Sequence, residues 1–493
     1  MIKNSTLQPI TKNNFMQIKQ DNTQNKPMYF GVAVLPVIIL ISLLFLNISF
    51  ANRTLFGNYS NQIILLIGAF TASIIGVLHQ YKTTQITQSV WHNIKSVKTP
   101  ISILLLVGAL AGSWLISGVI PAMVFYGLQI LNPKIFLPAT VIVTAIVSLS
   151  TGSSWTTTAT VGIALIGIGT ALGIEQGIIA GAVISGAYFG DKISPLSDTT
   201  NLAPAMAGTN LFTHIKYMLL TTFPTFVITL LFFLILSVNI KTSGQANIEE
   251  LLIIIQNHFY ITPWLFLIPV SVIVLIILKT KPLVALSLGI LFALIFALIF
   301  QLKLVNTLYP SKLETLLRAI ISNISIKTTN NQLNNLFSTS GVIGMLSTIA
   351  LIICAMIFGG VMDAIGALNK ITTLLLKLSN SIFGLFASTV ATCLGLNIIT
   401  ADQYLAIVIP GKMFKEAYQD KNLAPENLSR TLEDSGTVTS VLIPWNTCGA
   451  YQASVLGVNV SDYFIYAIFN WLSPFTTLFF AALSIKIKQL NNK

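Results

Sequence analysis

The chain has 493 residues, of which only 9% are Asp, Glu, Lys or Arg, whereas 54% are hydrophobic and the mean hydropathy is +0.81. Because soluble globular domains carry about 25% charged residues, this composition excludes a soluble enzyme, a disordered chain and a secreted disulfide scaffold. It predicts an all-α polytopic membrane protein, with most residues in helices that cross the lipid hydrocarbon. Since a carboxylate at membrane depth is costly, any of the 15 acidic residues that lies there is a candidate functional group.

The basic residues outnumber the acidic ones by 12, which in a soluble protein would suggest nucleic-acid binding. Here the charges are spread over the expected tails and loops, so the positive-inside rule explains them and no nucleic-acid partner is expected. The three cysteines and four histidines have neither metal-ligand nor disulfide-framework spacing, and we expect no cofactor.

Apolar segments follow one another along most of the chain. Runs of spanning length lie at about 30–50, 62–80, 100–130, 135–150, 211–238, 262–279, 282–304, 340–365, 370–398 and 463–487. Together with the apolar pieces at 155–190 and 402–445, which Gly, Pro and polar residues interrupt, they predict 11–13 membrane elements, including helical hairpins that do not cross fully. We divide the chain into a disordered cytoplasmic tail at 1–29, a first transmembrane repeat region at 30–240, connecting spans and a polar linker at 241–338, a second transmembrane repeat region at 339–487 and a C-terminal tail at 488–493.

The lysines between the first spans predict the orientation of the chain. Lys82, Lys95 and Lys98 lie between the second and third spans, whereas the segment between the first and second spans holds only Arg53. Positive charges are retained on the cytoplasmic side, so we expect the N-terminus in the cytoplasm and the spans in the bacterial cytoplasmic membrane. The polar segment 305–338 is either an interfacial helix or a plain linker.

Polar and helix-breaking residues concentrate in two windows, Ser148–His214 and Asn397–Asp462. The windows align at a constant offset of 249 residues, and the residues that match are mostly breakers or polar groups. The matching pairs include Thr151 and Thr400, Trp155 and Tyr404, Gly162 and Gly411, Pro195 and Pro444, Gly208 and Gly457, and Asn210 and Asn459. Corresponding interruptions in two halves indicate an inverted-repeat transporter with a binding site near the bilayer midplane.

A broken helix in the membrane is suited to binding a cation. It leaves unpaired N–H and C=O groups, which are costly in hydrocarbon unless they line a polar cavity or bind something. The carbonyls at a half-helix C-terminus attract cations, Ser, Thr and Asn oxygens add neutral ligands, and a carboxylate adds charge. The same carboxylate can hold a proton instead, so a cation and a proton would exclude each other from one group.

The acidic residues in the two windows differ in how strongly they indicate transport. Asp198, Asp402 and Asp434 each lie in a Ser-, Thr- and Gly-rich break flanked by apolar sequence, which favours a place in the transport pathway. Asp191 either takes part in transport or pairs locally with Lys192.

Other polar residues allow a purely structural interpretation. Ser and Thr in membrane helices often bond only a backbone carbonyl or a neighbouring helix, and this applies to Thr156, Thr157, Thr158 and Thr200 taken singly. Asp363 closes an apolar run and is either a helix-end acid or a second proton site.

Several motifs resemble the signature sequences of the NhaC-type Na+/H+ antiporter family. The longest is GDKISPLSDTTNLAP, at Gly190–Pro204. Matching pieces also occur at 112–128, 148–155, 402–411, 432–437 and 444–451. The resemblance covers roughly residues 30–485 of the chain.

This resemblance implies exchange of Na+ for H+ on a scaffold of two inverted repeats, each with a re-entrant hairpin and a broken helix. The hairpin tips would be Thr151–Thr158 and Thr400–Tyr404, and the broken helices would part at Pro195–Asn201 and Pro444–Gly449. We expect Na+ and H+ to bind at Asp198, Asp434, Asp402, Asp191, Ser153, Ser154, Thr199, Asn201, Asn446 and Thr447, with helix breaks at Gly152, Pro195, Gly436 and Pro444. Asp198 is the main exchangeable carboxylate in this hypothesis.

Relatives of the family also exchange organic acids or amino acids with Na+ or H+, which is the alternative function. The core motifs contain no basic residue except Lys192, with Lys412 and Arg430 flanking the second, and this favours a bare cation over a carboxylate substrate. A cation channel would favour symmetric rings of residues, unlike these paired and dissimilar breaks. An intramembrane hydrolase would need a base beside Ser153, which lacks a nearby His, so we expect no enzyme. Similar transporters are often homodimers, but nothing in the sequence indicates one.

Overall fold

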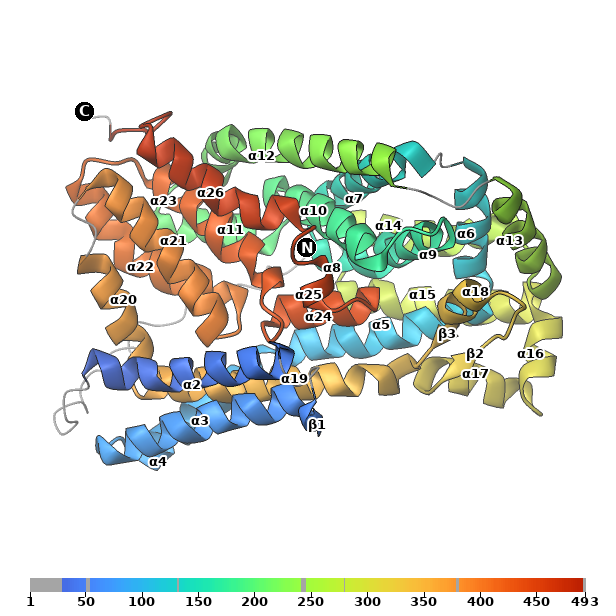
Figure 1. The fold of residues 1–493 in the computed structure, drawn as a ribbon, viewed down its shortest axis with the longest axis horizontal. Helices are drawn as coiled ribbons and strands as arrows, with labels where there is room; N and C mark the ends of the chain where they lie inside the picture. The colour runs from blue at the N-terminus through green and yellow to red at the C-terminus, as the bar shows by residue number, and fades with distance from the viewer. Residues whose placement is uncertain are drawn as a thin grey trace, which may run out of the picture.

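The computed structural model describes residues 29–49, 54–130, 133–240, 245–278, 280–377 and 381–490. Most of this described part is helical (Figure 1). Residues 1–28 of the expected N-terminal tail and residues 491–493 of the expected C-terminal tail lie outside it.

The first half of the chain forms helices α2 to α12 and one short strand, β1. The elements are α2 (Phe30–Ser49), β1 (Leu55–Asn58), α3 (Ser60–Leu78), α4 (Thr83–Ser96), α5 (Lys98–Ile116), α6 (Val119–Ile130), η1 (Pro133–Ile135), α7 (Phe136–Thr151), α8 (Ser154–Thr157), η2 (Thr158–Gly162), α9 (Ile163–Ala171), α10 (Gln176–Ile193), α11 (Asp198–Ala207) and α12 (Leu211–Asn239). Of these, η1 is a 3-10 turn and η2 is a π-helical turn between α8 and α9.

The second half is also helical. The elements are α13 (Gln245–His258), η3 (Pro263–Phe266), α14 (Leu267–Ile277), α15 (Pro282–Phe300), α16 (Leu302–Leu308), α17 (Lys312–Ile321), β2 (Ile324–Ser325), α18 (Asn331–Leu336), β3 (Ser338–Thr339), α19 (Gly341–Ala364), α20 (Ala367–Lys377), α21 (Ile382–Ile399), α22 (Gln403–Asp420), α23 (Pro425–Leu432), η4 (Glu433–Thr437), η5 (Ser440–Leu442), α24 (Thr447–Leu456), α25 (Val460–Tyr463) and α26 (Ile468–Ala482). Here η4 is π-helical, η3 and η5 are 3-10 turns, and β2 pairs with β3 in antiparallel fashion.

Seven helices in the described part of the chain are long and apolar enough to cross a membrane, namely α2, α3, α5, α12, α15, α19 and α21. Two further pieces, Ile248–His258 and Pro263–Ile277, meet at 86° and form a broken span or a re-entrant loop. The helices α6, α7 and α26 are apolar but shorter. In Figure 1 the long helices α2, α5, α12 and α19 run along the long axis of the molecule. The protein is therefore an all-α polytopic membrane protein.

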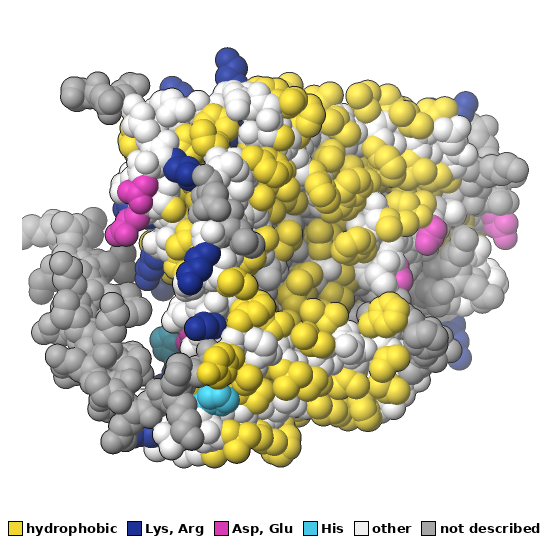
Figure 2. All heavy atoms as spheres, turned by 60° about the vertical axis from the view of Figure 1, so that its left-hand side comes forward, with side chains coloured by type: hydrophobic (Ala, Val, Ile, Leu, Met, Phe, Trp, Pro, Cys, Tyr) yellow, Lys and Arg dark blue, Asp and Glu magenta, His cyan; other side chains and the backbone are white. Residues whose placement is uncertain are grey.

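The outer surface of the bundle is largely apolar. Phe70 of α3, Ile235 of α12 and Ile299 of α15 are 67%, 63% and 62% exposed. Figure 2 shows hydrophobic side chains across the middle of one face and Lys and Arg side chains gathered toward one end. Exposed apolar area of this extent is unfavourable in water, whereas it matches the hydrocarbon core of a bilayer.

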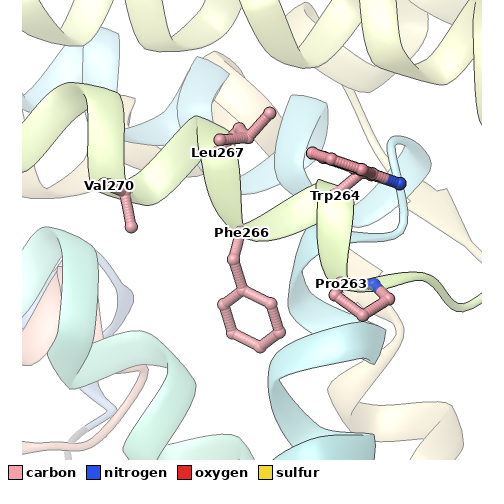
Figure 3. A pocket seen from close by; sticks show the side chains of 5 residues that line it. All are labelled: Pro263, Trp264, Phe266, Leu267 and Val270. Carbon is pink, nitrogen blue, oxygen red and sulfur yellow. The ribbon is translucent and has the colours of Figure 1, made fainter.

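A surface cavity of about 370 Å³ lies at the elbow between α13 and α14. Figure 3 shows its lining, Pro263, Trp264, Phe266, Leu267 and Val270, all of which are apolar. Trp264, Leu267 and Val270 are more than half exposed. A cavity with this lining suits a lipid tail and offers no oxygen ligands from side chains, so it is distinct from a cation site.

Some of the expected apolar runs consist of two helices. The run at 100–130 divides into α5 and α6 at Gly118, whose φ of 83° lies in the left-handed region that only glycine adopts readily. The run at 370–398 likewise falls into α20 and α21. The polar segment 305–338 folds into α16, α17 and α18 with the β2–β3 pair, so it is not a plain linker.

Helix ends recur at the 249-residue offset. The helix α10 and the segment from α23 to η5 begin and end at equivalent positions, and so do α11 and α24. Gly152 and Ala401, at the two hairpin turns, both have left-handed backbones with φ of 68° and 56°. Gly208 and Gly457, with φ of 91° and 68°, close α11 and α24. In each half, a turn at a left-handed residue therefore joins two helices, called a hairpin below, and a short break separates the next two helices, called a broken helix below.

Candidate functional site

The first hairpin turns at Gly152, between α7 and α8. A Cβ at this left-handed position would lie 2.6 Å from the Cβ of Leu196, so the tip packs directly against the break between α10 and α11. Ser153 begins the returning helix as its N-cap, because its Oγ accepts a hydrogen bond from the backbone N of Thr156 at 3.2 Å.

Asp191 links the broken helix α10 to this hairpin tip. Its Oδ2 accepts hydrogen bonds from the backbone N of Ser154 at 3.0 Å and from the Ser154 hydroxyl at 2.7 Å. The carboxylate thereby satisfies an N–H group at a helix start, where backbone donors lack intrahelical partners. Two of the predicted site residues are therefore in direct contact.

Side chains of α11 close the break that precedes it. Pro195 has no backbone N–H and cannot continue α10 as a regular helix. The amide nitrogen of Asn201 donates to the carbonyls of Pro195 at 2.9 Å and Ser197 at 2.7 Å. Thr200 donates to the carbonyl of Lys192 at 2.9 Å. Free carbonyls that the break creates are thus bound by α11 itself.

Two more predicted site residues stand at the start of α11. Asp198 is its first residue and is exposed, whereas Thr199 is buried with its hydroxyl 3.2 Å from that of Ser197. Asp198 interacts electrostatically with Asp191 and with Tyr404 of the second hairpin. It is therefore an accessible carboxylate at the start of α11, within electrostatic range of Asp191 and of the second hairpin.

The second hairpin turns at Ala401, between α21 and α22. Asp402 follows as the N-cap of α22 and accepts a hydrogen bond from the backbone N of Leu405 at 3.0 Å. It is 8% exposed. Asp402 therefore caps a helix, in the position that Ser153 has in the first hairpin.

Asn446 fastens the second helix break to α21. Pro444 lies in this break, between η5 and α24. The Asn446 amide nitrogen donates to the backbone carbonyl of Asn397 at 3.1 Å and to its side-chain oxygen at 3.2 Å. The Asn446 side-chain oxygen accepts from the backbone N of Cys448 at 3.0 Å and so caps α24. All of these polar groups are buried.

The neighbouring candidates Thr447 and Gly436 have different surroundings. The backbone N of Thr447 donates to the carbonyl of Ala401 at 2.9 Å, so the start of α24 is bound to the second hairpin tip. Gly436 lies inside the π-helical η4, where the helix widens but continues. A Cβ on Gly436 would lie 3.0 Å from the carbonyl oxygen of Ala406 in α22, so a close helix contact accounts for this glycine.

Hydrogen bonds between hairpin and broken helix recur at the 249-residue offset. Ser148 donates from its hydroxyl to the carbonyl of Ala187 at 2.6 Å. Asn397, at the equivalent position, donates to the carbonyl of Gly436 at 2.7 Å. The two windows thus share individual contacts as well as helix ends.

The first hairpin tip also contacts the second broken helix. The rings of Trp155 and Tyr451 stack with centroids 4.0 Å apart, and the Tyr451 hydroxyl donates to the Trp155 carbonyl at 3.0 Å. The two hairpins and the two broken helices therefore meet in one region.

A buried ion pair joins the two broken helices. Nζ of Lys192, near the end of α10, contacts Oδ1 of Asp434 in η4, and neither side chain is exposed. Oδ2 of Asp434 accepts hydrogen bonds from the hydroxyls of Thr221, at 2.8 Å, and Thr477. Lys192 also donates to Oγ of Ser473 at 3.0 Å.

The structure thus places the partner of Lys192 in the other half of the chain. Lys192 binds Asp434, 242 residues away, while its neighbour Asp191 binds Ser154. The local pairing of Asp191 with Lys192 that the sequence left open is not what the structure shows. The sequence feature that could have indicated this pair is Lys192 itself, a lone lysine close to the end of an apolar helix. An ionisable residue in such a position marks a functional site and needs a partner.

Two other buried ionisable residues, Glu433 and His214, had no role in the sequence-based hypothesis. Glu433 precedes Asp434 in η4 and is fully buried, and neither of its carboxyl oxygens has a hydrogen-bond partner among the described residues. His214 of α12 is also buried, with Nδ1 2.8 Å from Oγ of Ser429. The region around the two broken helices is therefore rich in ionisable groups that are buried inside an apolar bundle.

Hairpin tips packed against broken helices, with charged side chains sealed inside an apolar bundle, define a membrane transporter. A model of the Na+/H+ antiporter family matches residues 186–485. The chain belongs to this family, which confirms the resemblance drawn from its motifs.

Individual relatives agree with this membership. The chain is 38% identical over 432 residues to the Na+/H+ antiporter NhaC of Alkalihalophilus pseudofirmus, covering 87% of this chain and 92% of that protein. It is 35% identical over 439 residues to a malate-2H+/Na+-lactate antiporter of Bacillus subtilis, covering 89% of this chain and 91% of that protein. The solved structure of MtrF from Neisseria gonorrhoeae aligns with a TM-score of 0.37 and 16% identity over 81% of this chain and 84% of that chain.

Proposed function

We propose that the protein exchanges Na+ for H+ across the bacterial cytoplasmic membrane by alternating access. The observation that carries the proposal is the contact of Asp191, in a broken helix, with Ser154, at a hairpin tip. Carboxylate and hydroxyl oxygens are the ligands that hard cations prefer, and the same carboxylate can hold a proton instead. Na+ and H+ would therefore compete for the carboxylates near this tip, which couples their movements in opposite directions.

In this proposal Asp198 is the main exchangeable carboxylate. It is exposed and interacts with Asp191, so it can load from water while remaining close to the first hairpin tip. Neutral oxygen ligands for Na+ would come from Ser153, Ser154, Thr199 and Asn201. The second half would contribute Asp402, Asp434, Asn446 and Thr447, either as ligands or by their charge and dipoles.

The recurrence of helix ends and contacts at 249 residues supports two repeats of inverted topology as the moving parts. The first repeat would supply the Asp191 tip contact, and the second would supply Asp434. The N-terminus would face the cytoplasm, because Lys82, Lys95 and Lys98 follow the second span.

Reconstituted vesicles test the proposal directly. An outward Na+ gradient imposed on proteoliposomes should acidify the lumen, because each Na+ that leaves is exchanged for H+ that enters, and a pH-sensitive dye reports this change. Asp198→Asn should abolish the coupled exchange, whereas Asp420→Asn, at the exposed end of α22, should leave it unchanged. Full coupled exchange by the Asp198→Asn protein would overturn the assignment.

A second candidate function is exchange of an organic acid or amino acid with Na+ or H+. Arg430 of α23 is fully buried, and its three side-chain nitrogens have no hydrogen-bond partner among the described residues. Its guanidinium lies 4.6 Å from the ring centroid of Tyr217. A buried guanidinium with free donors can bind a carboxylate in a bidentate manner, and the malate-2H+/Na+-lactate antiporter is a relative.

Counterflow of a labelled substrate separates the two functions. Uptake of radiolabelled malate into vesicles preloaded with lactate, lost in Arg430→Gln, would favour the second function. Na+-driven pH change without counterflow of organic acids or amino acids would favour the first.

A further inference from the structure

Asp434 is surrounded by hydroxyl oxygens inside the bundle. Thr221 of α12 and Thr477 of α26 bond its Oδ2, and the Ser473 hydroxyl lies 3.5 Å from its Oδ1. Asp434, Thr477, Ser473 and Thr221 are each at most 1% exposed. A carboxylate with three hydroxyl groups, drawn from η4, α12 and α26, is a set of hard oxygen ligands suited to a small cation.

The ammonium group of Lys192 already contacts this set of oxygen atoms. The Lys192 ammonium contacts Oδ1 of Asp434, donates to Ser473 at 3.0 Å and lies 5.4 Å from the ring centroid of Phe469. Its side chain is fully buried. The ammonium therefore takes the place that a free monovalent cation would take beside this carboxylate.

Stability alone is a weak reason to keep such a pair. The desolvation of two buried charges offsets most of their attraction, and apolar replacements of both partners are often neutral or stabilising. Ionisable residues inside membrane proteins mark pathways for ions far more often than simple scaffolding. The Lys192–Asp434 pair is therefore better explained by exchange of its cation.

The end of α10 connects this pair to the first hairpin tip. Asp191 and Lys192 are consecutive, yet the first binds Ser154 at the tip and the second binds Asp434. The Thr200 hydroxyl of α11 lies 3.2 Å from the carbonyl oxygen of Asp191 and 2.9 Å from that of Lys192. A shift of the break between α10 and α11 would therefore move the carboxylate at the tip and the buried ammonium together.

We propose that Asp434, Thr221, Ser473 and Thr477 form a second, buried site for a monovalent cation, whose tethered occupant is the ammonium of Lys192. When a cation enters, one positive charge replaces another on Asp434, so the carboxylate is never left uncompensated. This inference rests on the proposed function, because the cation it takes is the transported one. Two other ionisable groups, Glu433 and His214, interact electrostatically with both members of the pair, and Asp191 interacts with Glu433.

Removal of the tethered charge tests the proposal in the purified full-length protein. The melting temperature is measured in detergent against NaCl, with choline chloride keeping the ionic strength constant, because a ligand that binds the folded state raises it. In Lys192→Met the half-saturating Na+ concentration should fall on the order of tenfold, which is a gain in Na+ affinity. The double variant Lys192→Met with Asp434→Asn should lose this gain in affinity. Lys488→Met, which removes a 44% exposed lysine from its ion pair with Glu426, should show the Na+ response of the wild type.

An unchanged Na+ response in Lys192→Met, or a gain that persists without the Asp434 carboxylate, would overturn the proposal. Because Lys192→Met leaves a buried charge unpaired, the variant could fail to fold. Thr221→Val and Thr477→Val then provide a second test, since both keep the ion pair and remove a hydroxyl oxygen.

Each of these two variants should raise the half-saturating Na+ concentration about threefold or more. Thr225→Val is the matched control, since Thr225 is one turn along α12 and bonds Thr221 and Thr476 instead of Asp434. Wild-type Na+ affinity in both variants, or an equal loss in Thr225→Val, would overturn the proposal. Na+/H+ exchange measured in vesicles tests the proposed function separately. If Na+ binding depends on Asp434 but the vesicles show no Na+/H+ exchange, the buried site is supported and the proposed exchange is refuted.

Discussion

Asp191 and Ser154, 37 residues apart, are joined by two hydrogen bonds to one carboxylate oxygen, from the backbone N at 3.0 Å and from the hydroxyl at 2.7 Å. The equivalent positions in the second half hold Ser440 and Gln403, whose side-chain oxygens are 3.5 Å apart. The two pairs occupy the same place between hairpin tip and broken helix, but the first pair has a negative charge and the second is neutral. The two tips are therefore alike in geometry, but the carboxylate lies on the broken helix at the first tip (Asp191) and on the hairpin itself at the second (Asp402).

Ser154→Ala should weaken Na+ binding without unfolding the hairpin. The substitution removes one of two hydrogen bonds to Asp191 and one hydroxyl ligand, while the bond from the backbone N remains. A single hydrogen bond contributes about 1 kcal/mol, so the Na+ concentration for half-maximal exchange should rise roughly fivefold. Ser150→Ala is the control, because Ser150 bonds the carbonyl of Ile146 within α7. Equal effects of the two substitutions would argue against a role of Ser154 in binding.

Substitutions of Asp402 separate helix capping from cation binding. Asn caps helices about as well as Asp, so Asp402→Asn should keep the wild-type melting temperature, whereas Asp402→Ala should lose about 1 kcal/mol of stability. Because the proposed function gives this charge a part in transport, Asp402→Asn should lower Na+ exchange at an unchanged melting temperature. Wild-type exchange by the Asp402→Asn protein would restrict Asp402 to capping.

Much of the architecture could be predicted from the sequence, because helix breakers act locally. Pro195 and Pro444 lack an N–H, and the structure has a helix break at each. The 249-residue offset between them also reappears in the helix ends. Gly436 shows where this reasoning fails. A glycine can break a helix, but it can also allow two helices to pack closely, and Gly436 packs against the carbonyl of Ala406.

The pairing of charges could not be predicted in the same way. Lys192 and Asp434 are 242 residues apart, and no spacing rule connects residues that meet through tertiary packing. Asp402 likewise looks the same in sequence whether it caps a helix or binds an ion. Such roles depend on which elements lie side by side, which the residue pattern does not specify.

Asn397→Ala should destabilise the second hairpin more than Ser148→Ala destabilises the first. Asn397 donates to Gly436 at 2.7 Å and to Thr439 at 3.1 Å, and it accepts from Asn446, whereas Ser148 makes one bond to Ala187. Each buried group left without a partner costs about 1–3 kcal/mol. Thermal melts in detergent should therefore rank wild type above Ser148→Ala and Ser148→Ala above Asn397→Ala. The reverse order would show that the number of hydrogen bonds does not set the relative stability of the two hairpins.

Gly152→Ala tests how closely the first hairpin tip must approach the helix break. Gly152 and Gly457 share a φ of 68°, and alanine in this left-handed region costs about 1–2 kcal/mol at either position. A Cβ at Gly152 would also lie 2.6 Å from the Cβ of Leu196 and 2.7 Å from its backbone carbon, whereas a Cβ at Gly457 meets nothing within 4 Å. Gly152→Ala should therefore lower the melting temperature further than Gly457→Ala does.

The same substitution should also affect transport, because the clash pushes the tip away from the break and separates Ser154 from Asp191. We expect Gly152→Ala to raise the Na+ concentration for half-maximal exchange, and Gly457→Ala to leave it unchanged. Measurement of both variants in proteoliposomes below their melting temperatures separates binding from stability. If Gly152→Ala binds Na+ like Gly457→Ala, the tip and the break need not be in contact for the cation to bind.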